Sequence, residues 1–367
     1  MIPLFKVHMP ESVLGAVREI LLSGYIGQGP KVEEFERALI PWMGSPNVLA
    51  VITGTASLRL AMRLAGVGPG TEVVTSPQTC IASNTPIIEQ GADVVWADVN
   101  PWTGNIDPLD VERKITPKTK AVVAIHWGGY PCDLDELVKV CKKYGIALIQ
   151  DAAHAFGATY RGRPVGALRS MTCCSFQAIK HLCTIEGGAL VCPTADDYRA
   201  GKLLRWYGID RDTSRVDMRC EEDVKDCGYK YNFNDVGAAI GLEQLKYVQG
   251  LLDRHRANAA FYSKALAGLK RVSLLRYASD RLSSYWLYTI RVDDRESFQD
   301  YMTKAGIMVS QVHVRNDLHT AFRAFRKNLP GVDEFCARQV SIPVGWWVTD
   351  EDRETISRAI IEWDNRP

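Results

Sequence analysis

Short apolar runs alternate with helical patterns from about residue 48 to residue 193, and this alternation constrains the fold more than any other feature of the chain. The runs are rich in β-branched residues and end at turn residues, whereas stretches such as 57–66 and 134–145 have the spacing of amphipathic helices. Strands that are apolar on both faces are typical of a mostly parallel sheet. The pattern therefore predicts an α/β layered domain. The expected strands are 48–53, 72–76, 93–98, 121–127, 146–151, 172–176 and 189–192.

The pattern changes after about residue 235. A long helical stretch covers 235–269. A smaller α+β unit follows, with a strand at 284–292, a helix at 295–306 and a strand at 307–314. The polar, unpatterned stretch 213–228 is expected to be a loop.

The length of 367 residues fits two or three domains. We expect a large domain over residues 1–245, with its N-terminal segment able to pack against a small C-terminal domain over 246–367. The chain has 44 Lys and Arg residues against 43 Asp and Glu residues, which gives a net charge of +1. Proteins that coat nucleic acids or bind membranes through basic patches need clustered positive charge, so this balance argues against both classes.

The ten cysteines form no CxxC pair, so neither a zinc ribbon nor a thioredoxin-like site is expected, and no metal is predicted. We expect reduced, buried thiols in a cytoplasmic protein. The N-terminus lacks the pattern of a signal peptide, and no run of 18 apolar residues indicates a membrane span.

The residues Gly54, Thr55, Ala56 and Ser57 follow the first expected strand and open a helix. Free backbone N–H groups and the positive end of the helix dipole make such a turn a suitable phosphate site. The alternative is an ordinary helix N-cap, in which a Ser or Thr side chain satisfies the first N–H groups.

Asp151 ends another expected strand, where open α/β sheets place groups that bind ligands. A buried carboxylate needs a partner, such as a protonated pyridine nitrogen, a metal or a helix N-terminus. His154 is either a second polar contact at this point or a structural imidazole.

Lys180 lies in a short connection between two expected strands, five residues after Ser175. A lysine held between buried strands can lose its hydration, which lowers its pKa and makes its amine a nucleophile for carbonyl groups. The alternative is a solvated loop lysine, and Ser175 either binds phosphate or ends a strand. Together, the lysine, the carboxylate and the phosphate turn are the parts that a pyridoxal phosphate enzyme needs.

The chain resembles the nucleotide-sugar aminotransferases of the DegT/DnrJ/StrS group over almost its whole length. The matching segments are 54–74, 91–107, 115–137, 151–168, 175–190, 203–211, 228–245 and 283–292. The resemblance implies a fold-type I aminotransferase with a large, mostly parallel seven-stranded sheet and a small α+β C-terminal domain.

The resemblance also implies roles for individual residues. Lys180 would form the Schiff base with pyridoxal 5'-phosphate and then carry the proton between substrate and cofactor. Asp151 would pair with the pyridine nitrogen, and His154 would lie near the ring hydroxyl. Lys230 would reach the phosphate across the interface of a homodimer with shared active sites. The phosphate would otherwise be held by Gly54, Thr55, Ala56 and Ser175, and Gln177 is a further cofactor-binding candidate.

Several positions depart from the usual pattern of that group. Cys80 stands where an aromatic ring commonly stacks on the cofactor, so stacking is expected to be weaker or to come from elsewhere. Ile185 replaces a common glycine, and the backbone there is expected to differ. Asn232 and Phe233 replace a frequent Arg-Met pair. The contacts to the donor carboxylate and the sugar are therefore expected to differ from those usual in the group.

The implied reaction moves an amino group, with L-glutamate as the expected donor, to C3 or C4 of a nucleotide-linked keto sugar in amino-sugar and polysaccharide biosynthesis. His313 and, more weakly, His319 are candidates for the sugar site. A dehydratase branch of the group has His in place of the lysine, so Lys180 favours transamination. A sugar dehydratase or another non-transaminating enzyme, and a catalytically silent binding protein, remain the alternatives.

Overall fold

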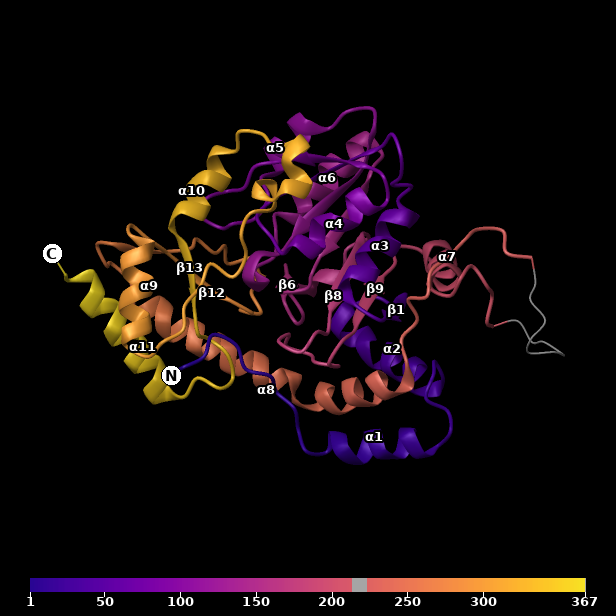
Figure 1. Ribbon diagram of the computed structural model, residues 1–367, viewed down its shortest axis with the longest axis horizontal. Helices are drawn as coiled ribbons and strands as arrows, with labels where there is room; N and C mark the ends of the chain where they lie inside the picture. Colours follow the sequence, from indigo (N-terminus) through magenta and orange to yellow (C-terminus); the bar gives the residue numbers. More distant parts are fainter. Residues whose placement is uncertain (213–222, 367) are drawn as a thin grey trace.

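The computed structural model describes residues 1–212 and 223–366. A seven-stranded sheet with the order β1-β9-β8-β5-β4-β2-β3 forms the centre of the molecule (Figure 1). Its strands are β1 (Val48–Val51), β2 (Glu72–Thr75), β3 (Asp93–Trp96), β4 (Thr119–Ile125), β5 (Ala147–Asp151), β8 (Met171–Ser175) and β9 (Gly188–Val191). Each coincides with one of the runs expected from the sequence, so the predicted mostly parallel, seven-stranded sheet is confirmed.

Strand β9 pairs in the antiparallel direction with both of its neighbours, β1 and β8. The chain passes from β8 to β9 through residues 176–187 without an intervening helix. A parallel neighbour needs a crossover connection that carries the chain back along the sheet, usually as a helix, whereas this segment returns directly and reverses the strand. The connection that carries Lys180 is therefore held between two paired strands.

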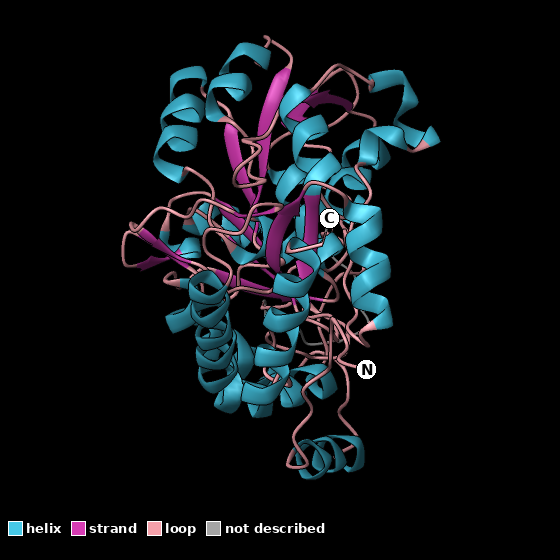
Figure 2. Ribbon diagram, turned by 90° about the vertical axis from the view of Figure 1, so that its left-hand side faces the viewer, coloured by secondary structure: helices cyan, strands magenta, loops and turns pink. Residues whose placement is uncertain are grey.

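Helices cover both faces of the sheet, as Figure 2 also shows. Leu49 and Val51 face the cluster beneath α3 (Gly54–Leu64) and α4 (Ile81–Glu89). Val48 and Ala50 face the cluster beneath α2 (Pro30–Met43) and α8 (Asp235–Ala265). This alternation within one strand is what burial on both faces requires. The remaining helices of this part are α1 (Val13–Leu22), α2 (Pro30–Met43), α5 (Pro108–Lys114), α6 (Leu134–Tyr144) and α7 (Ala195–Arg205).

The long helix α8 (Asp235–Ala265) connects two hydrophobic cores. Val248 and Leu252 pack in the core under β1, β8 and β9, whereas Ala259 and Tyr262 pack in the core of the C-terminal unit, residues 266–366. The helix ends four residues before the end of the predicted stretch at 269, and it crosses the proposed domain boundary at residue 245. The division into two domains stays a prediction.

The C-terminal unit contains a three-stranded antiparallel sheet of order β10-β12-β13. Its strands are β10 (Val272–Leu274), β12 (Tyr288–Val292) and β13 (Gln339–Ile342), and its helices are α9 (Arg295–Lys304), α10 (Pro330–Arg338) and α11 (Asp350–Asp364). A small third sheet joins β6 (Thr159–Tyr160), β7 (Arg163–Pro164) and β11 (Arg281–Leu282).

The strand predicted at 307–314 is wrong. This segment forms only isolated bridges, from Ile307 to Ile2 and from Ser310 to Ser341, and the third strand of the sheet is β13 instead. Val312 has a φ of 65°, which breaks an extended strand. The chain then crosses to the large sheet, where the Asn316 N–H donates to the Pro77 carbonyl.

Two further sequence predictions concern the strand at 284–292 and the loop at 213–228. The strand expected from residue 284 begins only at Tyr288, because Tyr285 adopts a φ of 50°. Of the loop expected at 213–228, residues 213–222 lie outside the described residues, and residues 223–228 form neither helix nor strand.

The N-terminal segment packs against the C-terminal unit: Ile2 pairs with Ile307, and the Trp347 indole N–H donates to the Pro3 carbonyl at 2.9 Å. The described cysteines are free; most are buried, but Cys227 is exposed. Within the described ranges, no helix is long and apolar enough to cross a membrane.

Candidate active site

A cavity of about 440 Å³ opens at the carboxyl ends of the parallel strands. Gly54 follows β1, Ile125 ends β4, Asp151 ends β5 and Ser175 ends β8, and all four residues line it. This edge of an open α/β sheet is where ligands bind, because loops and helix N-termini meet there. The volume suits a small organic molecule.

Asp151 is buried at the end of β5 and is held by two hydrogen bonds. Ser83 donates its hydroxyl to Oδ2 at 2.6 Å, and the Ala153 N–H donates to Oδ1 at 3.0 Å. Burial raises the pKa of the Asp151 carboxyl above its ordinary value, while these two bonds and the charge of Lys180 oppose the rise. The carboxylate is thus fixed in orientation and suited to receive a buried positive charge.

Lys180 lies between β8 and β9 with its amine in the cavity wall. Burial lowers its pKa to about 8, although the acidic groups of Asp151 and Cys80 raise the value in part. An amine with this pKa is partly neutral near neutral pH, so it can act as a nucleophile or a base. This burial argues against a solvated loop lysine, and the reactive role of Lys180 stays a prediction.

The N-terminus of α3 meets the cavity through Gly54 and Thr55. Thr53 is the N-cap, and its hydroxyl accepts from the Ala56 N–H at 3.0 Å. A Cβ on Gly54 would lie 2.8 Å from the Ser175 Cβ, so glycine allows the helix to approach β8 this closely. The turn is thus an ordinary helix N-cap, closed by a side chain, and it also presents its first residues to the cavity, as a phosphate site would.

Two histidine rings lie in the cavity wall. The His154 ring stacks on Trp286 with centroids 3.8 Å apart, and the His313 ring lies parallel to that of His154 at 5.7 Å. Burial lowers the pKa of His154 well below its ordinary value and that of His313 to about 4, so both rings are neutral at pH 7. Within the described residues, Nδ1 of His154 and Nε2 of His313 are buried without a hydrogen-bond partner.

Most of the residues predicted for the site are brought together by the fold. The cavity is lined by Gly54, Thr55, Cys80, Asp151, His154, Ser175, Gln177, Lys180 and His313. The remaining candidates do not line it: Ala56 is buried behind Thr55, and His319 lies between two short 3₁₀ segments. Lys230 is exposed elsewhere, with its amine 3.2 Å from the centroid of the Trp206 ring.

Known proteins resemble this chain over nearly its whole length. The profile of the DegT/DnrJ/EryC1/StrS aminotransferase family matches residues 8–361. The chain belongs to this family. The solved sugar aminotransferase CalS13 of Micromonospora echinospora is 42% identical, with a TM-score of 0.95 over 99% of this chain and 100% of that one.

Two more known proteins extend the comparison. The spore coat polysaccharide biosynthesis protein SpsC of Bacillus subtilis is 32% identical, covering 94% of this chain and 92% of that protein. Spr1654 of Streptococcus pneumoniae, solved in its pyridoxal phosphate form, is 29% identical, with a TM-score of 0.90 over 99% of this chain and 98% of that one. The chain is a pyridoxal phosphate-dependent sugar aminotransferase with a fold-type I architecture.

The cavity fits the cofactor of the DegT/DnrJ/EryC1/StrS family. Pyridoxal phosphate carries a pyridine nitrogen, a ring hydroxyl, an aldehyde and a phosphate. The cavity offers one group for each: the fixed carboxylate of Asp151, the unpartnered Nδ1 of His154, the amine of Lys180, and the start of α3 with Ser175.

Sequence reasoning missed Ser83, Thr79 and Trp286, which also line the cavity. Thr79 and Ser83 are joined through their hydroxyls at 2.8 Å and continue the hydrogen bonding from Asp151. Both lie near Cys80, where the sequence lacks the usual stacking aromatic residue. That departure could have drawn attention to these neighbouring hydroxyl groups. Trp286 lies in a run interpreted as an apolar strand, and nothing in that pattern separates it from a core residue.

Ile185 occupies the connection between Lys180 and β9 with a φ of 70°. This left-handed conformation favours glycine, and a β-branched residue adopts it at a cost. The expectation that the backbone differs from that of the group at Ile185 stays a prediction.

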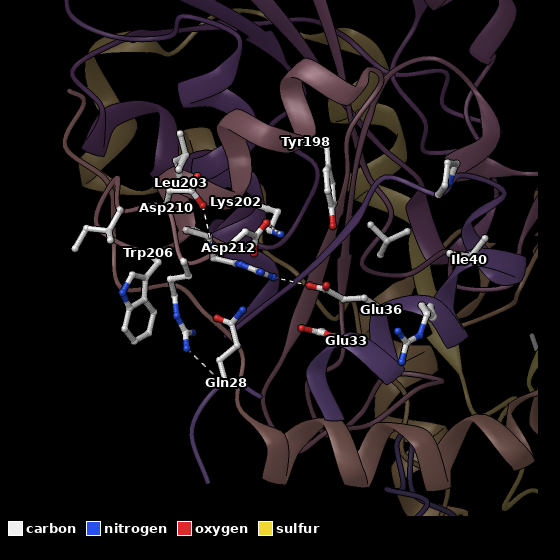
Figure 3. A pocket seen from close by; sticks show the side chains of 16 residues that line it. Gln28, Glu33, Glu36, Ile40, Tyr198, Lys202, Leu203, Trp206, Asp210 and Asp212 are labelled. Carbon is white, nitrogen blue, oxygen red and sulfur yellow. Dashed lines mark hydrogen bonds and ion pairs between the residues drawn. The ribbon is translucent and has the colours of Figure 1, made fainter. Parts of the chain in front are cut away.

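A second, more polar hollow lies between α2 and α7 (Figure 3). Glu36 points into it, opposite Tyr198 and Lys202. Arg205 donates to Glu36 at 2.5 Å and to the Ala50 carbonyl at 2.8 Å, and both charged side chains are largely buried. This ion pair ties both helices to the edge strand β1.

Glu36→Ala is expected to lower the free energy of unfolding by about 3 kcal/mol, because it leaves the Arg205 guanidinium buried without its partner. It also removes the acceptor of the Ala50 N–H. Urea unfolding of the full chain measures the loss. Glu33→Ala on the same helix is the control, and its exposed side chain should change stability by at most about 0.5 kcal/mol. Equal stability of the two variants would contradict the prediction.

Proposed function

We propose that the enzyme transfers the amino group of an amino acid, L-glutamate, to C3 or C4 of a nucleotide-linked keto-deoxy sugar. The observation that carries this proposal is the joint placement of Lys180 and Asp151 in one cavity, with the amine of lowered pKa on one side and the fixed carboxylate on the other. The polysaccharide role in the name of SpsC supports a place in amino-sugar and polysaccharide biosynthesis. Within that field, lipopolysaccharide is the product class that we propose.

The proposed chemistry divides among residues of the cavity. Bound pyridoxal phosphate supplies an electron sink next to the reacting nitrogen. Lys180 holds the cofactor and then moves a proton at its Nζ atom, while Asp151 keeps the pyridine nitrogen protonated. His154 orients the ring hydroxyl through its unpartnered nitrogen. The phosphate is bound by the N-terminus of α3 and by Ser175, with Gln177 beside it.

The sugar is proposed to bind beside His313, whose buried, neutral Nε2 is free to bond a hydroxyl group. His319 does not line the cavity and is the weaker candidate. Cys80 lies in the cavity wall at the N-cap of α4, so the aromatic surface around the cofactor would come from His154 and Trp286 instead.

A homodimer with shared active sites would explain the position of Lys230. Its exposed amine lies away from the cavity of its own chain and would be free to reach the phosphate in a second copy. Exposed apolar side chains on and after α1, such as Leu14, Leu22 and Tyr25, suit burial between two copies. We place this enzyme in the cytoplasm, which is consistent with its free thiols. Sedimentation of the purified protein tests the dimer.

The experiment that tests the reaction uses the purified enzyme with pyridoxal phosphate, nitrogen-15-labelled L-glutamate and a panel of nucleotide-linked keto sugars. Mass spectrometry should find a sugar nucleotide that carries the labelled nitrogen. A product that has lost a hydroxyl group without gaining the label would instead indicate a dehydratase. Failure to convert any sugar or glutamate would contradict the proposed function.

A further inference from the structure

Trp286 lies two residues before the start of β12 and is only 4% exposed. Its indole N–H donates to the Ile179 carbonyl at 2.8 Å. Ile179 directly precedes Lys180, so this bond fixes the indole to the turn that carries the reactive lysine. A residue of the C-terminal part of the chain is thereby anchored in the wall of the cavity formed by the large sheet.

The indole ring is held by stacking as well. The Phe5 ring stacks on it with centroids 5.1 Å apart and planes inclined by 28°, and the His154 ring is closer, at 3.8 Å and 19°. The plane of the indole ring is therefore fixed by three separate segments of the chain, through Phe5, His154 and the Ile179 carbonyl. A ring fixed in this way is preorganised for whatever lies against it.

The Lys180 Nζ atom lies 3.7 Å from the centroid of the Trp286 ring. An ammonium group at this distance is attracted by the electron-rich face of an indole, and the attraction grows when water is removed. The acidic groups of Asp151 and Cys80 act on Lys180 through space. The indole is therefore the surface on which the Lys180 ammonium rests in this structure.

We propose that Trp286 is a positioning residue that receives the Lys180 ammonium whenever this amine is not bonded to the cofactor. The contact keeps the released side chain next to the reacting carbon and stabilises its protonated form. It thereby helps to set the pH at which Lys180 gives up its proton. The proposal rests on the proposed role of Lys180.

Several titratable groups also face Lys180 and contribute to the protonation equilibrium of its amine. Asp151 at the end of β5 and Cys80 at the start of α4 raise its pKa, and burial lowers it. The neighbouring imidazoles of His154, His181 and His313 interact with its charge, and their own pKa values are lowered chiefly by burial. These rings are neutral near the pH at which Lys180 titrates, so their charge stays constant while the lysine changes.

A series of fluorinated tryptophans placed at position 286 tests the proposal, because fluorine weakens the attraction for a cation with little change in ring size. The readout is the pH midpoint for chemical modification of Lys180, followed by mass spectrometry of its peptide. The full-length protein is used with pyridoxamine phosphate, which has no aldehyde to bond with the lysine. The midpoint should fall stepwise with each added fluorine, by about one pH unit over the series.

The same substitutions at Trp127 provide the control. Trp127 is equally buried and lies edge-on to His154 and His313 with centroids 6.4 and 6.1 Å away, but it has no cation–π contact with Lys180. An unchanged midpoint in the position-286 series, or an equal change in both series, would overturn the proposal. The readout is a lysine pKa and not product formation, so its failure is distinguishable from failure of the proposed function.

Discussion

Lys180→Ala is expected to reduce turnover by about 1000-fold or more, because it removes both a nucleophile and a proton carrier from the cavity. Borohydride reduction of the wild-type enzyme with pyridoxal phosphate should attach the cofactor to the peptide that contains Lys180. The variant should bind the cofactor without this attachment. Turnover with labelled glutamate and mass spectrometry of the digested protein measure the two effects separately.

Lys202→Ala is the matched control for this prediction. Lys202 is also largely shielded, with its side chain 29% exposed, but it pairs with Asp212 in the polar hollow between α2 and α7. The control should keep both turnover and attachment at Lys180. Thermal unfolding should show that Lys180→Ala is folded, and an external small amine should restore part of its activity. Full activity of Lys180→Ala, or attachment of the cofactor to another lysine, would contradict its assigned role.

Asp151→Asn is expected to lower turnover by about 100-fold to 1000-fold, because it replaces the charge facing the pyridine nitrogen with a neutral amide of nearly the same shape. The amide oxygen can accept from the Ala153 N–H while the amide nitrogen donates to the Ser83 hydroxyl, so the fold should change little. A neutral partner no longer favours the protonated ring nitrogen, and the cofactor then withdraws electrons less effectively. Turnover and cofactor affinity, measured side by side, separate this effect from loss of binding.

Ser83→Ala is the matched control for Asp151→Asn. It removes the hydrogen bond that orients the carboxylate but keeps the charge, so turnover should fall by roughly tenfold, the equivalent of one ordinary hydrogen bond. The pKa of the Asp151 carboxyl should rise further, since the Ser83 bond favours its charged form. Turnover of Asp151→Asn close to that of the wild type would show that the carboxylate does not act on the ring nitrogen.

The large sheet and the centre of its site could be predicted from the sequence for physical reasons. Buried parallel strands need continuous apolar runs, and these runs recur at the spacing of a βα pattern. Asp151 and Lys180 stand out because a carboxylate and an amine next to such runs are expensive to bury without a function. The fold then places both side chains in one cavity, as a shared cofactor site requires.

The parts that escaped prediction depend on contacts between distant segments. The run at 307–314 has the composition of a strand, but the chain leaves the small sheet to reach Pro77 beside the cavity. Trp286 has the appearance of a core residue, and only the arrival of Ile179 and Lys180 beside it reveals another role. Lys230 points away from its own cavity, so a single chain cannot test its assignment.

Helix α8 has a mechanical consequence for substrate entry. Its 31 residues form a rod about 46 Å long that is embedded in both hydrophobic cores. This helix therefore provides no free hinge between the two cores. Any movement that opens the cavity must tilt the helix as a whole or bend it. Gly250 lies on the exposed side of the helix, between Val248 and Leu252 in the half that packs under the large sheet; there is open space where a Cβ would be, and glycine weakens a helix interior. Bending would concentrate there, on the outer side of the molecule and away from the reacting groups.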